Sequence, residues 1–553
     1  MLISVLTAVL ASSALACLIG LASAQLTQGI WRRRPVLALP LAVLGLGVLM
    51  WLDFLVMWLV PPAGPVVAGL AVSLCVVYCA VKRSWRLLAR SAPIAIATAG
   101  IGMTYMGLMF LWRSDLSALS LAASRFVVDR TSMPVDNAIP TLLAIRIGAG
   151  ESTHALVGDW NGSDRPPLQS GWILLNDALF SRLGFEVDAL PFAAGLVAQL
   201  LWIPALCGLL RAIGFGSRSS LMAVLFTAAT GTLLTNTTYT WPKLLSAALL
   251  CCAMVVLIDA IRRRGMVVLS SVGAAALFAL AMLAHGGAAL TAPAFGILGF
   301  IALRRQPART WVLAPLAAAA TGVALYAPWL AFQRLFDPPG DRLLKWHLAG
   351  VMGVDSRPLF ETLADSYSRI SLVEWLSVRW ANVTRIVNLD LTAGLGSFSE
   401  AALGARRGHE FFVTSIALGL GMALLVLMIT AVSARRIRVG LVSPLLRRAI
   451  LMIGLTVPCL LLWSLVFFMP GSTVVHHGSH LWIVILLAVP AAWLARTRPW
   501  LAFAAWVAQL ALTLAVYVPF FGASNIDSAS LVTLGSGLVV LGAAAWWARR
   551  SLA

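Results

Sequence analysis

Residues 241–284 read WPKLLSAALLCCAMVVLIDAIRRRGMVVLSSVGAAALFALAMLA, and this stretch decides the fold class. Its two apolar runs, 241–260 and 266–284, are each about 20 residues long, which is enough for an α-helix to cross a bilayer. The link between them carries three consecutive arginines, Arg262 to Arg264. Short links rich in Lys and Arg mark the cytoplasmic side of membrane proteins. The stretch therefore predicts two membrane helices that are joined on the cytoplasmic side.

The same pattern recurs along the whole chain of 553 residues, of which 60% are hydrophobic and only 11% are charged. A soluble chain has about a quarter of its residues charged. We predict an all-α, polytopic membrane protein with about 15 membrane helices. Their predicted spans are 2–24, 36–59, 65–81, 92–112, 190–210, 219–236, 241–260, 266–284, 288–303, 310–332, 411–432, 449–469, 481–495, 500–520 and 530–547.

The distribution of charge predicts the orientation of these helices. If the N terminus lies outside and the C terminus in the cytoplasm, more than half of the 40 Lys and Arg residues fall in cytoplasmic links or the C-terminal tail. The acids fall on the outer side, except for Asp53 and Asp259, which lie within predicted helices. The excess of Arg over Lys and the abundant Ala favour a bacterial plasma membrane. The net charge of +19 is then explained by topology and by contacts with anionic membrane lipids, so we expect no nucleic-acid partner.

Two long polar stretches divide the chain into five regions. We predict N-terminal membrane helices over 1–112, a first extracytoplasmic loop over 113–190, central membrane helices over 191–332, a second extracytoplasmic loop over 333–408 and C-terminal membrane helices over 409–553. Both loops have helix-like periodicity, which predicts amphipathic helices that lie on the membrane surface. The acids gathered on this side indicate a functional outer face.

The first loop is the richest in chemistry, with SMPVDNAIPTLLAIRIGAG at 132–150 and VGDWNGSDRPPLQSGWILLNDALFSRLGF at 157–185. Transfer of a group from a lipid phosphate needs a carboxylate that takes a proton from the acceptor hydroxyl. It also needs cationic groups, or a metal, that hold the departing phosphate. Asp136, Asp164 and Arg165 could supply both functions. In the alternative interpretation the acids cap helices and the arginine pairs with one of them.

The order of these motifs resembles the first periplasmic loop of the GT-C superfamily of glycosyltransferases. The closest pattern is that of the lipid A aminoarabinose transferases and of bacterial relatives of the protein mannosyltransferases. The resemblance covers residues 135–185, and it departs from the family where Asn137 replaces Glu and Arg165 replaces Lys. The matching motifs are Asp136-Asn137, Gly158-Asp159-Trp160 and Asp164-Arg165-Pro166-Pro167-Leu168.

The resemblance implies a GT-C fold and an active site on the extracytoplasmic face. It implies that Asp136 is the catalytic aspartate, that Asp164 is an acid able to hold a metal, and that Arg165 lies at the donor phosphate. The residues themselves leave open whether Asp136 or Asp159 is the general base.

Three further residues at predicted outer boundaries could contact the donor. Lys243 begins a helix, where the positive end of the helix dipole adds to its charge, although an interfacial anchor beside Trp241 explains it equally well. His285 lies in a tight turn and could bind phosphate or join Asp164 on a metal, or be an ordinary interfacial histidine. In the cluster VHHGSH at 475–480, His480 is the candidate for donor contact.

These observations together predict a glycosyltransferase with a polyprenyl-phosphate sugar as donor and a cell-envelope glycan or lipid as acceptor. Asp136 would act as general base, and the anomeric carbon would invert. No cofactor is required, and Asp164 and His285 are the candidate ligands if a divalent metal takes part. The alternatives are a transporter or flippase of a lipid-linked saccharide, which Asp53 would suit, and a non-enzymatic scaffold of the cell envelope.

Overall fold

The chain is described by a computed structural model that covers residues 1–84, 88–112, 119, 123, 137–185, 188–263, 266–387, 399–413, 419–439, 443–470, 480–518 and 528–549. Its regular elements in these ranges are all helical, and they contain no β-strand. The predicted all-α class is therefore confirmed. Asp136, His476 and His477 lie outside the described residues.

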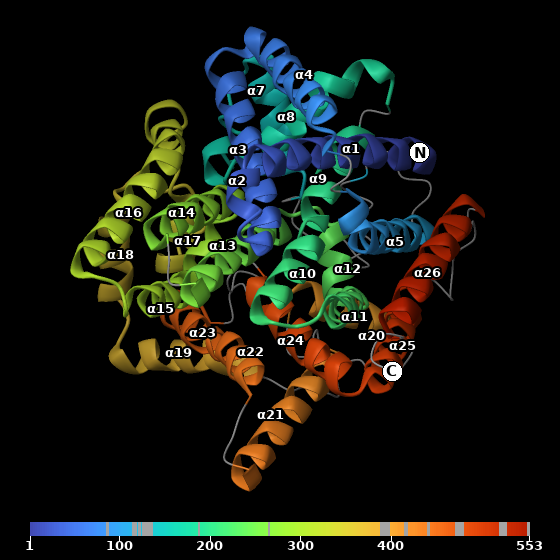
Figure 1. The fold of residues 1–553 in the computed structure, drawn as a ribbon. Coiled ribbons are helices and arrows are strands. Elements are labelled where there is room, and N and C mark those ends of the chain that lie inside the picture. The colour runs from blue at the N-terminus through green and yellow to red at the C-terminus, as the bar shows by residue number, and fades with distance from the viewer. Residues whose placement is uncertain are drawn as a thin grey trace.

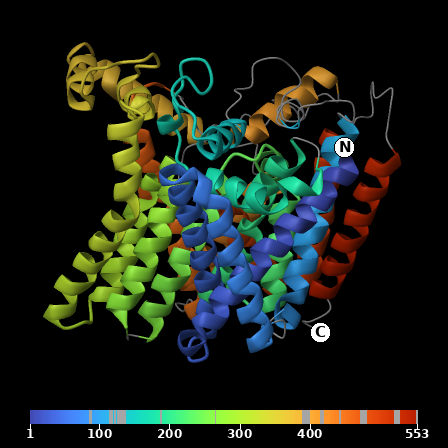
Figure 2. The same ribbon diagram turned by 90° about the horizontal axis from the view of Figure 1, so that it is seen from above.

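Twelve helical segments in the described ranges are long and apolar enough to cross a membrane. They lie side by side, with the polar segments gathered at one end of the bundle (Figure 2). The N terminus lies at this end, called here the loop end, and α26 carries the chain to the opposite end. The spanning elements are α1 (Leu2–Leu26), α3 (Ala38–Leu59), α4 (Gly64–Lys82), α5 (Leu88–Trp112), α9 (Ala189–Leu200) with α10 (Trp202–Ile213), α13 (Lys243–Arg263), α14 (Val267–Ala284), η7 (Gly286–Thr291) with α15 (Ala292–Leu303), α16 (Ala308–Ala331) with η8 (Phe332–Phe336), α22 (Pro444–Gly454) with α23 (Thr456–Val466), α25 (Pro499–Tyr517) and α26 (Ser528–Arg549).

The other three predicted spans fall on helices that are broken or short. The predicted span 219–236 corresponds to α11 (Ser217–Ala228) and α12 (Gly231–Thr238), which are separated where Thr230 adopts an extended conformation. The predicted span 481–495 corresponds to α24 (Leu481–Thr497), which is mostly buried inside the protein. The predicted span 411–432 overlaps α21 (Leu420–Val439), whose apolar part ends at Ala434. The structure thus supports twelve of the predicted spans by length and composition.

Burial separates the central helices from those at the rim. Every residue of α13 from Lys243 to Ala260 is buried, and α13 packs against α10 and α14. By contrast, only Ala314 and Trp329 of α16 are buried, and in Figure 1 this helix lies at the edge of the bundle. An apolar helix with an exposed surface suits contact with lipid, whereas a helix enclosed on all sides, such as α13, belongs to the core.

One of the two acids within predicted helices is explained at the end of α13. The carboxylate of Asp259 forms ion pairs with Arg34 at 3.0 Å and with Arg263 at 3.1 Å. A buried carboxylate is stable only when cations or hydrogen-bond donors compensate the loss of water. Asp259 therefore ties the last turn of α13 to the link before α3.

The loop end is built from short helices in both predicted outer loops (Figures 1 and 2). In the first loop these are α7 (Ile139–Ala149), η5 (Gly162–Asp164) and α8 (Leu168–Phe180), and in the second loop α17 (Arg342–Ala349), α18 (Leu359–Ser368), α19 (Leu372–Val387) and α20 (Glu400–Phe411). Outside the two loops the described residues also form α2 (Gln28–Trp31) and short 3-10 turns at Pro35–Leu37 and Pro61–Ala63, and a further 3-10 turn follows α8 at Ser181–Leu183. Among the helices of the first loop, α8 packs against α3 and α9, so it is part of the helix bundle and does not lie on the membrane surface.

Candidate functional site

The N terminus of α13 is held by two buried glutamines. Gln199 Oε1 accepts a hydrogen bond from the backbone N–H of Leu244 at 3.0 Å, and its amide nitrogen donates to Gln169 Oε1 at 2.8 Å. Gln169 in turn donates to the carbonyl oxygen of Thr240 at 2.8 Å. The first N–H groups of a helix need acceptors, and here neutral amides supply them. The positive end of the α13 dipole is therefore not cancelled by a capping carboxylate.

Lys243 is the first residue of this helix and is fully buried. Its ammonium lies 3.2 Å from the centroid of the Trp241 ring, and the same ring meets His285 edge-on with 6.4 Å between centroids. His285 occupies the turn between α14 and η7, where Nδ1 accepts a hydrogen bond from the backbone N–H of Gly287 at 3.0 Å. Two residues that are 42 positions apart in the sequence therefore meet across one tryptophan.

Arg165 and His347 complete a group of four basic side chains from four separate segments. Burial lowers the pKa of His285 well below its usual value, and the charges of Lys243, Arg165 and His347 lower it further. Burial also lowers the pKa of His347 to about 3, again with Arg165 and Lys243 contributing. Such mutual effects arise between charges that lie close together. We call Arg165, Lys243, His285 and His347 the cationic cluster.

Asp164 lies beside Arg165 and shapes the loop that carries both residues. Its carboxylate accepts a hydrogen bond from the backbone N–H of Asn161 at 2.9 Å, which closes a capping box around η5. Burial raises the pKa of Asp164, while the hydrogen bond from Asn161 and the charges of Arg342 and Arg165 lower it. Asp164 thus has the capping role of the alternative interpretation, and it also lies within electrostatic reach of the cationic cluster.

Asp159 is exposed and already paired. Arg342 donates to its carboxylate at 2.9 Å and to its carbonyl oxygen at 2.8 Å, and the guanidinium of Arg342 stacks 3.9 Å from the centroid of the Trp160 ring. The hydrogen bond from Arg342 is the main reason that the pKa of the Asp159 carboxyl is lowered. A carboxylate with a lowered pKa accepts a proton less readily. This pairing makes Asp159 less suited to accept a proton than an unpaired carboxylate would be.

The two predicted outer loops are joined through Asp337, whose side chain is completely buried. Its carboxylate accepts hydrogen bonds from the Thr153 hydroxyl and the Ser163 backbone N–H, both at 2.8 Å, and it lies 2.7 Å from His154 Nδ1. Gln333 adds a second link when its amide nitrogen donates to the Ser163 carbonyl oxygen at 2.9 Å. The segment that carries Asp164 and Arg165 is thus docked onto the start of the second loop.

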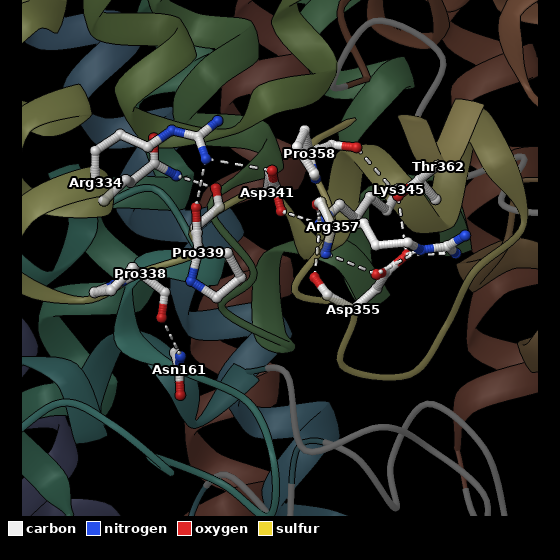
Figure 3. Close-up of polar contacts among 12 residues, drawn as sticks. Asn161, Arg334, Pro338, Pro339, Asp341, Lys345, Asp355, Arg357, Pro358 and Thr362 are labelled. Atoms are coloured by element: carbon white, nitrogen blue, oxygen red, sulfur yellow. Dashed lines mark hydrogen bonds and ion pairs between the residues drawn. The ribbon is translucent and has the colours of Figure 1, made fainter. Parts of the chain in front are cut away.

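Figure 3 shows how this contact continues into the second loop. Asn161 donates to the carbonyl oxygen of Pro338 at 3.3 Å, and Asp341 forms ion pairs with Lys345 at 3.0 Å and with Arg334 at 3.3 Å. Lys345 also donates to the carbonyl oxygens of two residues beyond α17, Asp355 and Arg357, both at 2.6 Å. These bonds fix α17, and α17 carries His347.

His480 lies beside α12, with its Nε2 2.9 Å from Asn236 Oδ1.

A second buried polar group lies at the start of α12. There Glu410 forms an ion pair with Arg406 at 3.2 Å and accepts a hydrogen bond from the Tyr517 hydroxyl at 2.8 Å. This group holds α20 against α12 and α25.

The cluster thus brings together three residues predicted from sequence, Arg165, Lys243 and His285, and adds one that was not predicted, His347. His347 lies in RLLKWHLAG at 342–350, and no motif distinguishes it. Its only sequence signal is that it shares the predicted outer side with the other histidines. Among the residues that the structure describes, no group of three or more His, Cys, Asp or Glu side chains is arranged to hold a metal ion. The predicted metal roles of Asp164 and His285 remain predictions.

Comparison of the chain with protein-family models, curated proteins and solved structures found no match. The similarity to GT-C enzymes therefore rests on the motifs of the first outer loop. What can be concluded about function rests on the geometry of the cationic cluster.

Proposed function

We propose that this multi-pass membrane protein is a glycosyltransferase that takes a sugar from a polyprenyl-phosphate donor. The donor phosphate would bind at the cationic cluster, and the acceptor would be a cell-envelope glycan or lipid. The membrane would be the bacterial plasma membrane, with the loop end on its extracytoplasmic side and the C terminus in the cytoplasm.

The observation that carries this proposal is the gathering of four basic side chains at the loop end, of which Arg165, Lys243 and His285 are buried and His347 is half-buried. The guanidinium of Arg165 stays charged in proteins, and Lys243, His285 and His347 can each carry a proton. Basic side chains that come from separate segments and gather at one site create a positive potential that attracts an anion. A phosphate group, which carries negative charge on several oxygens, suits such a site, because Arg and Lys both bind phosphate.

In the proposed reaction the acceptor hydroxyl gives its proton to Asp136 as its oxygen attacks the anomeric carbon. The bond between that carbon and the phosphate oxygen breaks, and its electron pair leaves with polyprenyl phosphate. Lys243 and Arg165 would stabilise the charge that develops on the phosphate, and electrostatic stabilisation of this kind is often the largest contribution to catalysis. The polyprenyl chain would remain in the lipid beside the bundle.

A transporter of lipid-linked saccharides is the second candidate, and the break between α11 and α12 favours it. Discontinuous helices form the substrate sites of many transporters. Asp53 adds to this, because it is buried within α3 and its Oδ2 has no hydrogen-bond partner among the described residues. Buried acids within membrane helices are often functional.

The deciding experiment measures transfer of labelled sugar from a panel of polyprenyl-phosphate sugars to an envelope extract, with purified protein in lipid nanodiscs. We expect transfer by the wild type, none by Asp136→Asn, and a large loss in Arg165→Gln. Arg146→Gln is the matched control, because Arg146 is a half-exposed cation at the same end, paired with Glu151 at 2.8 Å. Absence of transfer from every donor, together with movement of a lipid-linked saccharide across liposomes, would instead establish the transporter.

A further inference from the structure

Helix α19 in the second loop has three distinct faces. With about 100° per residue, Leu372, Val373, Leu376 and Trp380 share one arc of about 100°. All four side chains are more than half exposed. Arg379 and Asn382, which are buried, lie next to this arc on the side of Leu372. Glu374 and Ser377 form an exposed polar face beyond Val373, on the other side of the arc.

The buried face fixes the height of α19 relative to the bundle. Arg379 donates to the carbonyl oxygen of Leu465, and Asn382 donates to those of Ser464 at 3.3 Å and Phe467 at 3.2 Å. These carbonyls belong to the last turn of α23, whose C-terminal acceptors have no partners within the helix. Because α23 ends a membrane span, α19 lies at the level where that span leaves the bilayer. Figure 1 places α19 beside α23.

The exposed apolar arc continues a surface that must already face lipid. On α23 the side chains of Val457, Leu461 and Leu465 form an exposed stripe with a spacing of four residues. The first outer loop differs, because in its described segment 137–185 only two large apolar side chains are exposed, those of Ile145 and Leu183, and they are far apart in the sequence. An arc of four exposed apolar side chains on one helix is therefore a feature of α19 and not of that segment.

We propose that α19 is an interfacial helix whose apolar arc inserts into the lipid leaflet at the loop end. Its three faces then meet three environments: protein on the side of Arg379, lipid on the side of Leu376 and water on the side of Glu374. A helix with this division lies in the plane of the membrane surface, with its apolar side chains at the boundary between headgroups and acyl chains. Trp380 suits this depth, since tryptophan is enriched at membrane interfaces.

This contact with lipid would be mechanically linked to the cationic cluster. The backbone N–H of Phe468 donates to the carbonyl oxygen of His347 at 2.8 Å, and the rings of His347 and Phe467 lie 5.1 Å apart. Asn382 of α19 binds the carbonyl oxygen of the same Phe467. The end of α23 thus connects α19 to His347, whatever anion the cluster binds.

The test uses photo-crosslinking in nanodiscs of phosphatidylglycerol and phosphatidylethanolamine. p-Benzoylphenylalanine replaces Leu376 on the apolar arc or Ser377 on the polar face, and mass spectrometry identifies the adducts. Both positions are exposed, so neither replacement disturbs the packing. We expect severalfold more lipid adduct at position 376 than at position 377, because the two side chains point about 100° apart around the helix axis. Equal lipid adducts at 376 and 377, or adducts at 376 with a second copy of the chain or another protein, would overturn the proposal.

Discussion

Replacement of Lys243 by Met tests the cationic cluster most directly. Lys243 is fully buried at the start of α13, and Met has a similar length without the charge. The change removes one cation from a group that includes Arg165. It also removes the contact between the ammonium and the Trp241 ring, which is worth about 0.5–2 kcal/mol. The relief of repulsion opposes this loss, so we expect the ligand-free protein to keep its fold with a change in unfolding free energy below about 2 kcal/mol.

The effect on anion binding should be much larger. Two unit charges about 4 Å apart attract by about 4 kcal/mol at an effective dielectric constant of about 20. Removal of one partner of a buried charge pair costs about 2–5 kcal/mol. A loss of about 2–4 kcal/mol corresponds to an increase in Kd of about 30- to 1000-fold. The exposed control Arg146→Gln should change the free energy of binding by at most about 1 kcal/mol, because water screens such charges.

The assay is equilibrium binding of a fluorescent polyprenyl phosphate to each protein in nanodiscs, at one fixed salt concentration. Thermal unfolding of the ligand-free proteins shows whether each variant keeps its fold. If Lys243→Met keeps its fold and binds the phosphate as tightly as Arg146→Gln does, the cluster is not the phosphate site. A variant that loses its fold would show that Lys243 stabilises α13 rather than a ligand.

Three further predictions follow from the same contacts. The pKa of both imidazoles of the cationic cluster is lowered, and a bound anion raises it, so binding takes up protons. The Kd of polyprenyl phosphate should therefore fall as the pH is lowered through the bound-state pKa of the histidines, by at most about tenfold per pH unit for each histidine; a Kd that does not change between about pH 8 and pH 4 would mean that neither histidine meets the anion. Asp337→Asn weakens charge-assisted hydrogen bonds that are worth about 1.5–3 kcal/mol each. Hydrogen exchange of the backbone amides over residues 153–163 should therefore become about tenfold faster or more, while the amides of the membrane spans stay protected; unchanged exchange over 153–163 would contradict the role of Asp337 in joining the two loops. In Gly231→Ala the new Cβ would lie 1.8 Å from the Glu410 carboxylate, which should lower the unfolding free energy by about 1–3 kcal/mol and lower the Tm. Gly296→Ala has no atom within 4 Å of its new Cβ and should leave the Tm unchanged; equal Tm values for the two variants would refute the close packing of α20 on α12.

The sequence by itself determined the fold class and most of the membrane helices. Length and hydrophobicity are local properties, and α13 and α14 follow from them because a bilayer accepts only segments that are apolar and satisfy their own backbone hydrogen bonds. The same local reasoning failed for 219–236, where composition does not reveal that the helix breaks at Thr230. It also could not separate α24, which the protein itself buries, from a helix that lipid surrounds.

The candidate site divides in the same way. Lys243 and His285 were noticeable because a basic residue at the boundary of an apolar stretch is a local signal, and Arg165 was noticeable because it belongs to a short motif of the first loop. The pairing of Asp159 with Arg342, and the approach of His347 to the other three, depend on segments that are more than 60 residues apart in the sequence. Only the tertiary structure decided these, because the packing of the bundle, and no periodicity or motif, sets which distant side chains share one buried space.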